Sequence, residues 1–177
     1  MFTRNYTGKE VLYGCAVLVD QLILTDVSQA IATARAEIFK ELSKSADGEA
    51  YTLLQTIPGI GPYIAASILG EIQNIDRFHS SDSLVAYAGL DPKIKQSGKV
   101  LNSTGRLTKR GSSYLRRSLF IAANISRMYD PSLKAYYDKK RSEGKTHTVA
   151  VCVVARKLTR IIWSVWKNNK PYYLPEN

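Results

Sequence analysis

The longest helical pattern in the sequence lies near the N-terminus, over residues 9–44. Apolar side chains recur there at steps of three and four, the spacing of one face of an α-helix, and no proline interrupts the stretch. At about 1.5 Å per residue, a helix of this length would span roughly 54 Å, which is more than a small globular domain accommodates. Two interpretations remain open. The segment is either a coiled-coil arm that joins copies of the chain, or a core helix broken near Thr25 and Asp26, because the heptad pattern is imperfect at Thr25 and Gln29.

A domain boundary is expected where this pattern ends. Residues 43–49 are polar and contain Asp47-Gly48, a pair typical of turns. We therefore expect residues 1–48 to form a helical arm that serves in dimerisation, and residues 49–177 to form a separate domain.

Beyond the boundary the sequence predicts a fold that is all-α in the main. Helix starts are indicated by Ser112 and by Asp130 followed by Pro131, residue types favoured at the N-cap and at the first helical position. Residues 91–111 are polar, basic and punctuated by glycine, so we expect a long loop or a short β-hairpin there. The expected helices are 78–89, 112–128, 131–141 and 146–168.

The charge is divided unequally along the chain. Residues 1–90 carry six basic and ten acidic side chains, whereas residues 91–177 carry 19 basic and five acidic ones, in a chain of net charge +10. A strongly basic half favours a polyanionic ligand, most simply nucleic acid, over a merely solvated lysine-rich surface.

Several classes of protein are excluded by the composition. A hydrophobic content of 45% argues against a disordered chain. The longest apolar run, residues 149–155, is too short to span a bilayer. Cys15 and Cys152 lie in apolar segments, which favours a reducing cytoplasm, and neither histidine has zinc-ligand spacing, so we expect no metal site. The expected location is therefore the cytoplasm, and the family resemblance described below implies a bacterial or archaeal cell, in association with the nucleoid.

A turn-forming motif lies in residues 53–70, which read LLQTIPGIGPYIAASILG. It resembles the helix-hairpin-helix module of DNA repair and recombination proteins. Gly59 and Gly61 permit a tight turn and let backbone N–H groups approach a phosphate, while the next helix directs its positive end at the same anion. Ile60 would fill the core beneath the turn. The alternative is an ordinary helical corner with glycine at the turn.

Further motifs follow in a fixed order. They are YAGLDP at 87–92, QSGK at 96–99, TKRGS at 108–112, LRR at 115–117 and VARKL at 154–158. Together they resemble the C-terminal domain of the insertion-sequence one-ten family of transposases, relatives of the Piv DNA invertases. The resemblance covers about residues 51–173.

The resemblance implies DNA recombination by an active site in two parts. One part is a RuvC-like domain with four metal-binding carboxylates, and the other is a serine of the C-terminal domain that attacks the DNA backbone. The family also implies a coiled-coil arm that assembles oligomers, here residues 9–44, and a structured guide RNA. These residues hold no RuvC-like domain, so we interpret the chain as a C-terminal fragment, a truncated copy or a stand-alone piece. Mg²⁺ is then expected only with that domain, and no cofactor in this chain.

Ser97 is the candidate nucleophile that the family resemblance implies. It lies in the basic segment that contains Lys93, Lys95 and Lys99, which would surround a phosphate with positive charge. Ser103 and Ser112 are competitors, although a helix cap explains Ser112 better. Without the resemblance, a turn serine in a DNA-contacting loop would be the preferred interpretation.

Basic residues on both sides of this segment are candidate phosphate contacts. Arg116 and Arg117 are adjacent on a predicted helix and cannot both face the same way, so one is expected to pair internally. The full set of candidate DNA-binding residues is Gly59, Ile60, Gly61, Lys93, Lys95, Lys99, Arg106, Lys109, Arg110 and Arg116.

Two other functions remain open. The chain could be a non-catalytic helix-hairpin-helix module that binds DNA or structured RNA. It could also be a DNA glycosylase of the hairpin type, with Asp91 as the only nearby catalytic carboxylate, although the helical body expected before the hairpin is missing.

Overall fold

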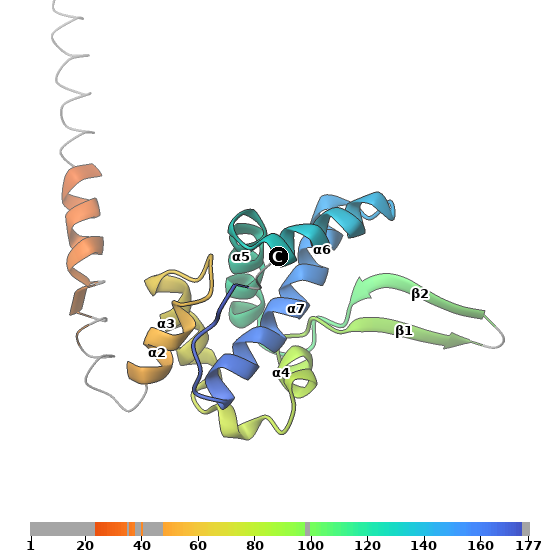
Figure 1. Cartoon of the computed structure of the whole chain (residues 1–177), viewed down its shortest axis with the longest axis horizontal. Coiled ribbons are helices and arrows are strands. Elements are labelled where there is room, and N and C mark those ends of the chain that lie inside the picture. The colour runs from red at the N-terminus through yellow and green to blue at the C-terminus, as the bar shows by residue number, and fades with distance from the viewer. Residues whose placement is uncertain (1–23, 35, 38–39, 41–47, 98–99, 175–177) are drawn as a thin grey trace, which may run out of the picture. The chain divides into compact units, whose positions relative to one another are not determined.

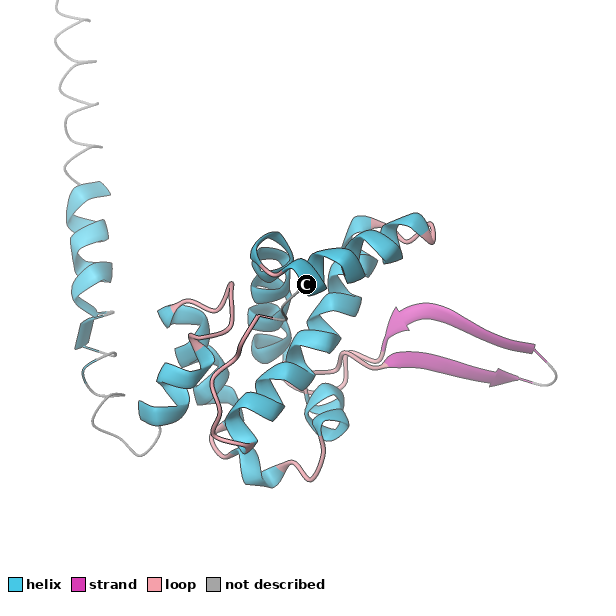
Figure 2. Cartoon of the chain, viewed as in Figure 1, coloured by secondary structure: helices cyan, strands magenta, loops and turns pink. Residues whose placement is uncertain are grey.

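The computed structural model describes residues 24–34, 36–37, 40, 48–97 and 100–174. The chain divides into two compact units, Met1–Glu41 and Leu42–Asn177. In the first unit the described residues are helical and exposed, which confirms a helix for that part of the predicted arm (Figure 2). The rest of residues 9–44, including Cys15, lies outside the described residues.

The second unit is mainly helical, as predicted, and carries one two-stranded sheet (Figures 1 and 2). Its elements are α2 (Gly48–Leu54), α3 (Pro62–Ile72), the short 3-10 helix η1 (Ile75–Arg77), α4 (Ser81–Tyr87), β1 (Pro92–Ser97), β2 (Val100–Leu107), α5 (Ser113–Tyr129), α6 (Pro131–Ser142) and α7 (His147–Lys167). No helix among the described residues is long and apolar enough to cross a membrane.

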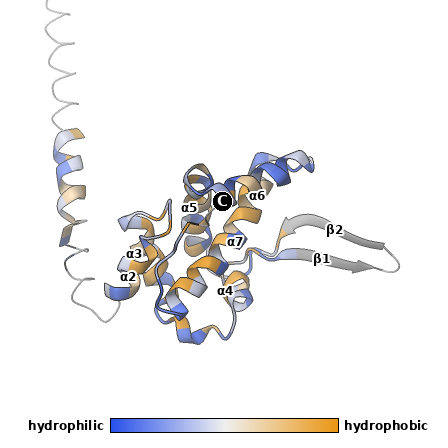
Figure 3. Cartoon of the chain, in the orientation of Figure 1, coloured by the Kyte–Doolittle hydropathy of each residue, from blue (hydrophilic) through white to orange (hydrophobic). Residues whose placement is uncertain are grey.

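Helix α7 is the central element of the core. It packs against α2, α4, α5, α6 and η1. Val151, Val154, Leu158 and Ile162 recur at steps of three and four, and all four are fully buried, so one stripe of α7 faces the other helices. Figure 3 shows this stripe as apolar colour along α7 beside polar residues.

The helix starts follow the local sequence. The Ser112 hydroxyl accepts a hydrogen bond from the Leu115 N–H at 3.0 Å, and the Asp130 carboxylate accepts from the N–H groups of Ser132 and Leu133 at 2.8 and 3.1 Å. Ser80 and Ser83 form a reciprocal capping box at the start of α4. The expected caps at Ser112 and Asp130 are therefore confirmed.

Residues 92–97 and 100–107 pair as the two strands of a β-hairpin, so the second of the two structures expected for this segment is confirmed. Strands β1 and β2 are antiparallel, with Ile94 opposite Ser103 and Ser97 opposite Val100, and the register shifts between Pro92 and Ile94. Figure 1 shows the hairpin extending away from the helices of this unit.

The segment after α7 returns to the helical core. The N–H of Tyr172 donates to the Thr56 hydroxyl at 2.8 Å, and its phenol donates to the buried Asp130 carboxylate at 2.5 Å. Asp130 thus caps α6 and fixes the C-terminal segment at the same time. Burial alone would raise the pKa of Asp130, but the hydrogen bonds from Tyr172, Leu133 and Ser132 hold it below its ordinary value. Burial and the same contact raise the pKa of Tyr172 to about 12.

Candidate nucleic-acid interface

The turn between α2 and α3 occupies residues 55–61. Gly59 adopts a φ of +91°, and a Cβ atom built on it would lie 2.5 Å from the backbone nitrogen of Ser126 in α5. A side chain is therefore excluded at Gly59 by the packing of the turn on α5, as well as by its backbone conformation. From the sequence, Gly59 was explained by the approach of backbone N–H groups to a phosphate. The structure adds a second reason, which is the close packing of the turn on α5.

The other two turn candidates differ in exposure. Ile60 is 3% exposed and packs in the core, so its side chain has the structural role that the sequence predicted. Gly61 is exposed and forms the N-cap of α3 without a side-chain cap hydrogen bond. A Cβ atom on Gly61 would meet nothing within 4 Å. Gly61 is therefore the open point of the turn.

The base of the hairpin joins residues 87–91 to residues 108–112. The N–H groups of Thr108, Lys109 and Ser112 donate to the carbonyls of Asp91, Gly89 and Tyr87 at 2.9, 3.3 and 3.0 Å. The two segments that frame the hairpin in the sequence are thus paired backbone to backbone.

Two glycines allow this close approach. Gly89 has a φ of +67°, and its Cβ would lie 2.6 Å from the Arg110 carbonyl oxygen. Gly111 has a φ of +112°, and its Cβ would lie 2.0 Å from the Tyr87 carbonyl oxygen. Both positions therefore require glycine, and these are the glycines of the YAGLDP and TKRGS motifs.

Two arginines hold the same segment from the helical side. Arg116 of α5 donates through Nη1 to the Ala88 carbonyl at 3.1 Å. Arg156 of α7 donates through Nε and Nη2 to the Leu90 carbonyl at 3.2 and 3.1 Å. We call this pair the arginine clamp. The structure thus places the predicted phosphate contact Arg116 in an internal contact, and Arg117 is the exposed member of the adjacent pair.

The candidate nucleophile lies at the far end of the hairpin from this base. Ser97 is the last residue of β1 and pairs with Val100 of β2. Lys93 and Lys95 belong to β1, and Ser103 and Arg106 belong to β2. Lys99 lies outside the described residues.

The remaining candidates divide into exposed and internally paired residues. Lys109 and Arg110, at the base of the hairpin, are exposed. Ser112 donates its hydroxyl to the Glu71 carboxylate at 2.5 Å while it caps α5, which agrees with the capping role preferred for it. The half-buried Asp91 accepts at its backbone carbonyl from Thr108.

Other basic residues of α7 are engaged within the domain. Arg160 pairs with Asp82 at 2.8 Å, and the Lys157 ammonium lies 5.2 Å from the centre of the Tyr136 ring. Arg156, Lys157 and Arg160 of α7 therefore each have a partner within the domain.

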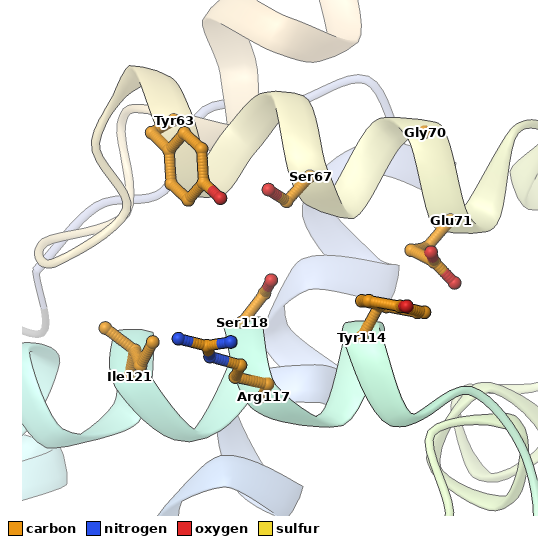
Figure 4. Close-up of a pocket in the computed structure, with 8 residues that line it drawn as sticks. All are labelled: Tyr63, Ser67, Gly70, Glu71, Tyr114, Arg117, Ser118 and Ile121. Carbon is orange, nitrogen blue, oxygen red and sulfur yellow. The ribbon is translucent and has the colours of Figure 1, made fainter. Parts of the chain in front are cut away.

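A groove between α3 and α5 was not foreseen from the sequence (Figure 4). It has a volume of about 520 Å³. Its lining residues are Tyr63, Ser67, Gly70 and Glu71 from α3, and Tyr114, Arg117, Ser118 and Ile121 from α5. The helical spacing of these residues is visible in the sequence, but their meeting across two helices is not.

Among the residues that the structure describes, no group of three or more His, Cys, Asp and Glu side chains could hold a metal ion. Burial raises the pKa of the half-buried Cys152 thiol above its ordinary value.

Comparison with known proteins identifies the domain that contains this interface. Residues 51–138 match the family model described as "Transposase IS116/IS110/IS902 family". The chain is 33% identical over 122 residues to the insertion element IS900 uncharacterized 42 kDa protein of Mycobacterium paratuberculosis, covering 68% of this chain and 30% of that protein. It is 33% identical over 122 residues to the pilin gene-inverting protein of Moraxella bovis, covering 68% and 38%.

A third relative is named as a transposase. The transposase for insertion sequence element IS1111A of Coxiella burnetii is 30% identical over 122 residues, which cover 67% of this chain and 33% of the relative. The matched part of the chain thus spans 30 to 38% of the length of these relatives. The family resemblance seen in the sequence motifs is confirmed, and this chain belongs to the IS116/IS110/IS902 family of transposases through the domain that holds the α2–α3 turn and the hairpin.

Proposed function

We propose that this chain is the DNA-binding and strand-transfer domain of a site-specific transposase, with Ser97 as its nucleophile. The observation that carries the proposal is the construction of the hairpin base. Gly89, Gly111 and the arginine clamp fix the two segments from which the hairpin carrying Ser97 extends. The hairpin that carries Ser97 is therefore held at a fixed place on the helical domain, as a nucleophile on that hairpin would require.

The proposed chemistry is attack on a phosphodiester. The Ser97 hydroxyl oxygen would form a bond to phosphorus, the bond from phosphorus to one deoxyribose oxygen would break, and that sugar would leave with a hydroxyl group. The acceptor of the serine proton would come from a RuvC-like domain supplied by another polypeptide segment.

DNA is the proposed partner of this surface. Support comes from the excess of basic residues in 91–177, from exposed Lys109 and Arg110 at the hairpin base, and from Gly61 at the open start of α3. The relatives named as a transposase and as a gene-inverting protein support the same partner. Phosphate contacts hold the duplex without reading bases, so target choice would require another component, for which a structured guide RNA is the proposed candidate.

The first unit is the proposed site of self-association. Leu24, Val27 and Ile31 are 67, 50 and 45% exposed and follow one another at steps of three and four on one helix. A second copy of the chain would bury this apolar seam. Sedimentation of the Ile31→Lys variant tests this part, since a charge in the seam should shift the chain toward the monomer.

The test of the nucleophile uses a complete enzyme that contains this domain. Ser97→Ala should abolish strand cleavage and leave duplex binding unchanged, whereas the matched variant Ser103→Ala should cleave normally. Unchanged cleavage by Ser97→Ala would remove the nucleophile assignment and favour the alternative, a non-catalytic module that binds DNA or structured RNA. Binding to duplex DNA should weaken steeply between about 50 and 200 mM salt if phosphate contacts dominate.

A further inference from the structure

The groove between α3 and α5 combines aromatic, cationic, hydroxyl, carboxylate and aliphatic side chains in one place. Figure 4 shows Tyr63 and Ser67 of α3 facing Arg117 and Ser118 of α5, and Glu71 of α3 above Tyr114 of α5. Aromatic, cationic and hydroxyl groups therefore line one groove, separate from the hairpin.

The rings of the two tyrosines in the groove are exposed. Tyr63 is 69% exposed and Tyr114 is 73% exposed. Among the described residues neither ring has an aromatic partner or a cation stacked on it. Exposed aromatic faces in a basic domain are the groups on which nucleic-acid bases stack, and a base can use such a face only when it is unpaired.

The two charged side chains of the groove, Arg117 and Glu71, lie at different places along it. Arg117 is exposed, and no described residue forms a hydrogen bond or ion pair with it, in contrast to Arg116, Arg156 and Arg160. Its guanidinium is therefore available to a phosphate. Glu71 lies at the Tyr114 end, and its Oε2 already accepts a hydrogen bond from the Ser112 hydroxyl. Its carboxylate would repel a phosphate there, while Oε1 would accept a hydrogen bond from a base amino group.

We propose that this groove binds unpaired nucleotides, with bases stacked on Tyr63 and Tyr114 and a phosphate held by Arg117. The inference rests on the proposed function only in taking the ligand to be nucleic acid. The shared chemistry is an unpaired base with its phosphate, which a strand separated from DNA and a single-stranded part of an RNA both offer.

The first experiment measures binding by fluorescence anisotropy, using the whole 177-residue chain. The probes are a labelled DNA strand of about 12 nucleotides, the RNA of the same sequence and the corresponding DNA duplex. Tyr63→Ala and Tyr114→Ala should each weaken binding of a single strand about tenfold, while Tyr63→Phe and Tyr114→Phe should stay within about twofold of the original chain. Whichever strand binds more tightly, DNA or RNA, identifies the source of the ligand.

The matched control is Tyr129→Ala. Tyr129 lies on the same helix as Tyr114 and is 66% exposed, but it does not line the groove. Its removal should leave single-strand binding unchanged. An equal loss in Tyr129→Ala and Tyr114→Ala would overturn the proposal, because stacking would then not be confined to the groove.

A second test fills the groove at Gly70 without removing any side chain that lines it, and compares a large substitution with a small one. Gly70 is exposed, lies inside α3, and has open space where a Cβ would be. Gly70→Leu should therefore fold normally and occupy the groove, weakening single-strand binding about tenfold, whereas Gly70→Ala should bind as the original chain does. Normal binding by a folded Gly70→Leu variant, checked by circular dichroism, would overturn the proposal.

The duplex probe separates this inference from the proposed function. If the original chain binds duplex DNA but not a single strand, or if the groove variants weaken both probes equally, the groove proposal fails while DNA binding stands. If no probe binds, the proposed DNA-binding function fails first, and the groove proposal fails with it.

Discussion

The helical core and the hairpin of the second unit are held in different ways. Helices α5 and α7 bury rows of apolar side chains against each other, and the Ser112 side chain caps the start of α5. The hairpin has two strands, which pair with each other and are joined to the helices through hydrogen bonds at one end. Burial stabilises the first region and backbone geometry orients the second, so substitutions should separate the two.

The largest effect is expected at Gly111. Its Cβ would lie 2.0 Å from the Tyr87 carbonyl oxygen at a φ of +112°, so both the steric clash and the backbone conformation oppose a side chain. Gly111→Ala should lower the free energy of unfolding by about 3 kcal/mol or displace the hairpin. Urea denaturation measures the first outcome, and amide exchange in β1 and β2 measures the second.

The control for this prediction is Gly144→Ala. Gly144 has a φ of +79°, but a Cβ on it would meet nothing within 4 Å. It should therefore report backbone strain alone, at about 1 kcal/mol. Equal effects of the two substitutions would show that close packing at the hairpin base is not the reason for glycine there.

Loss of the Asp130 side chain should affect the helical core and leave the hairpin alone. This carboxylate caps α6 and accepts the Tyr172 phenol while 1% exposed. Asp130→Ala should lower the free energy of unfolding by about 2–3 kcal/mol at pH 7. Amide exchange within the hairpin should not change, and faster exchange there would contradict the separation of the two regions.

The same carboxylate should make the stability of the core depend on pH. Its pKa is lower in the folded chain than its ordinary value, so its stabilising contribution is complete above about pH 4 and is lost as the pH falls through the folded pKa. Asp130→Asn should flatten this acid dependence in urea titrations at about pH 7 and pH 3. If Asp130→Asn loses as much stability between pH 7 and pH 3 as the original chain does, other carboxylates cause the acid dependence.

Arg156→Met should affect the hairpin more than the helical core, the reverse of the expectation for Asp130→Ala. The substitution removes two hydrogen bonds to Leu90 but keeps an apolar stem on α7, so the overall unfolding free energy should fall by only about 1 kcal/mol. Amide exchange in the hairpin should accelerate about tenfold relative to α7, measured by mass spectrometry. Uniform acceleration across the domain would show that the clamp serves global stability instead.

The smallest effect is expected from Arg160→Met. Arg160 lies one helical turn beyond Arg156 and pairs with Asp82 in an ion pair whose side chains are 47 and 73% exposed. Solvent screens such a pair, so the unfolding free energy should change by less than about 0.5 kcal/mol and hairpin exchange should not change. Arg160→Met is therefore the matched control for the clamp variant, and an effect as large as that of Arg156→Met would remove the distinction between them.

Local features were predictable from the sequence because their causes act over a few residues. Ser112 and Asp130 each cap a helix through N–H groups within three residues, so the residue types at those positions were sufficient. Burial of Ile60 beneath the turn was expected from its position between the two glycines of the motif. The order of the motifs identified the family, but it did not decide whether residues 91–111 form a long loop or a β-hairpin.

The roles of the basic residues could not be predicted in the same way. Arg116 was expected to contact phosphate, but whether Arg116 or Arg117 pairs internally depends on the position of Ala88, which lies 28 residues earlier. Arg156 finds its acceptor 66 residues away. The groove likewise depends on how α3 and α5 pack, and no periodicity within either helix specifies the other.

The sequence by itself determined the helices, their caps, the uneven charge and the family of this chain, because each depends on residue type and on spacing within a few turns. Only the tertiary structure decided which arginines are used internally, why Gly59, Gly89 and Gly111 cannot carry side chains, and that Tyr63 and Tyr114 line opposite ends of one groove. These outcomes depend on contacts between residues far apart in the chain, whose geometry is set by the packing of whole helices.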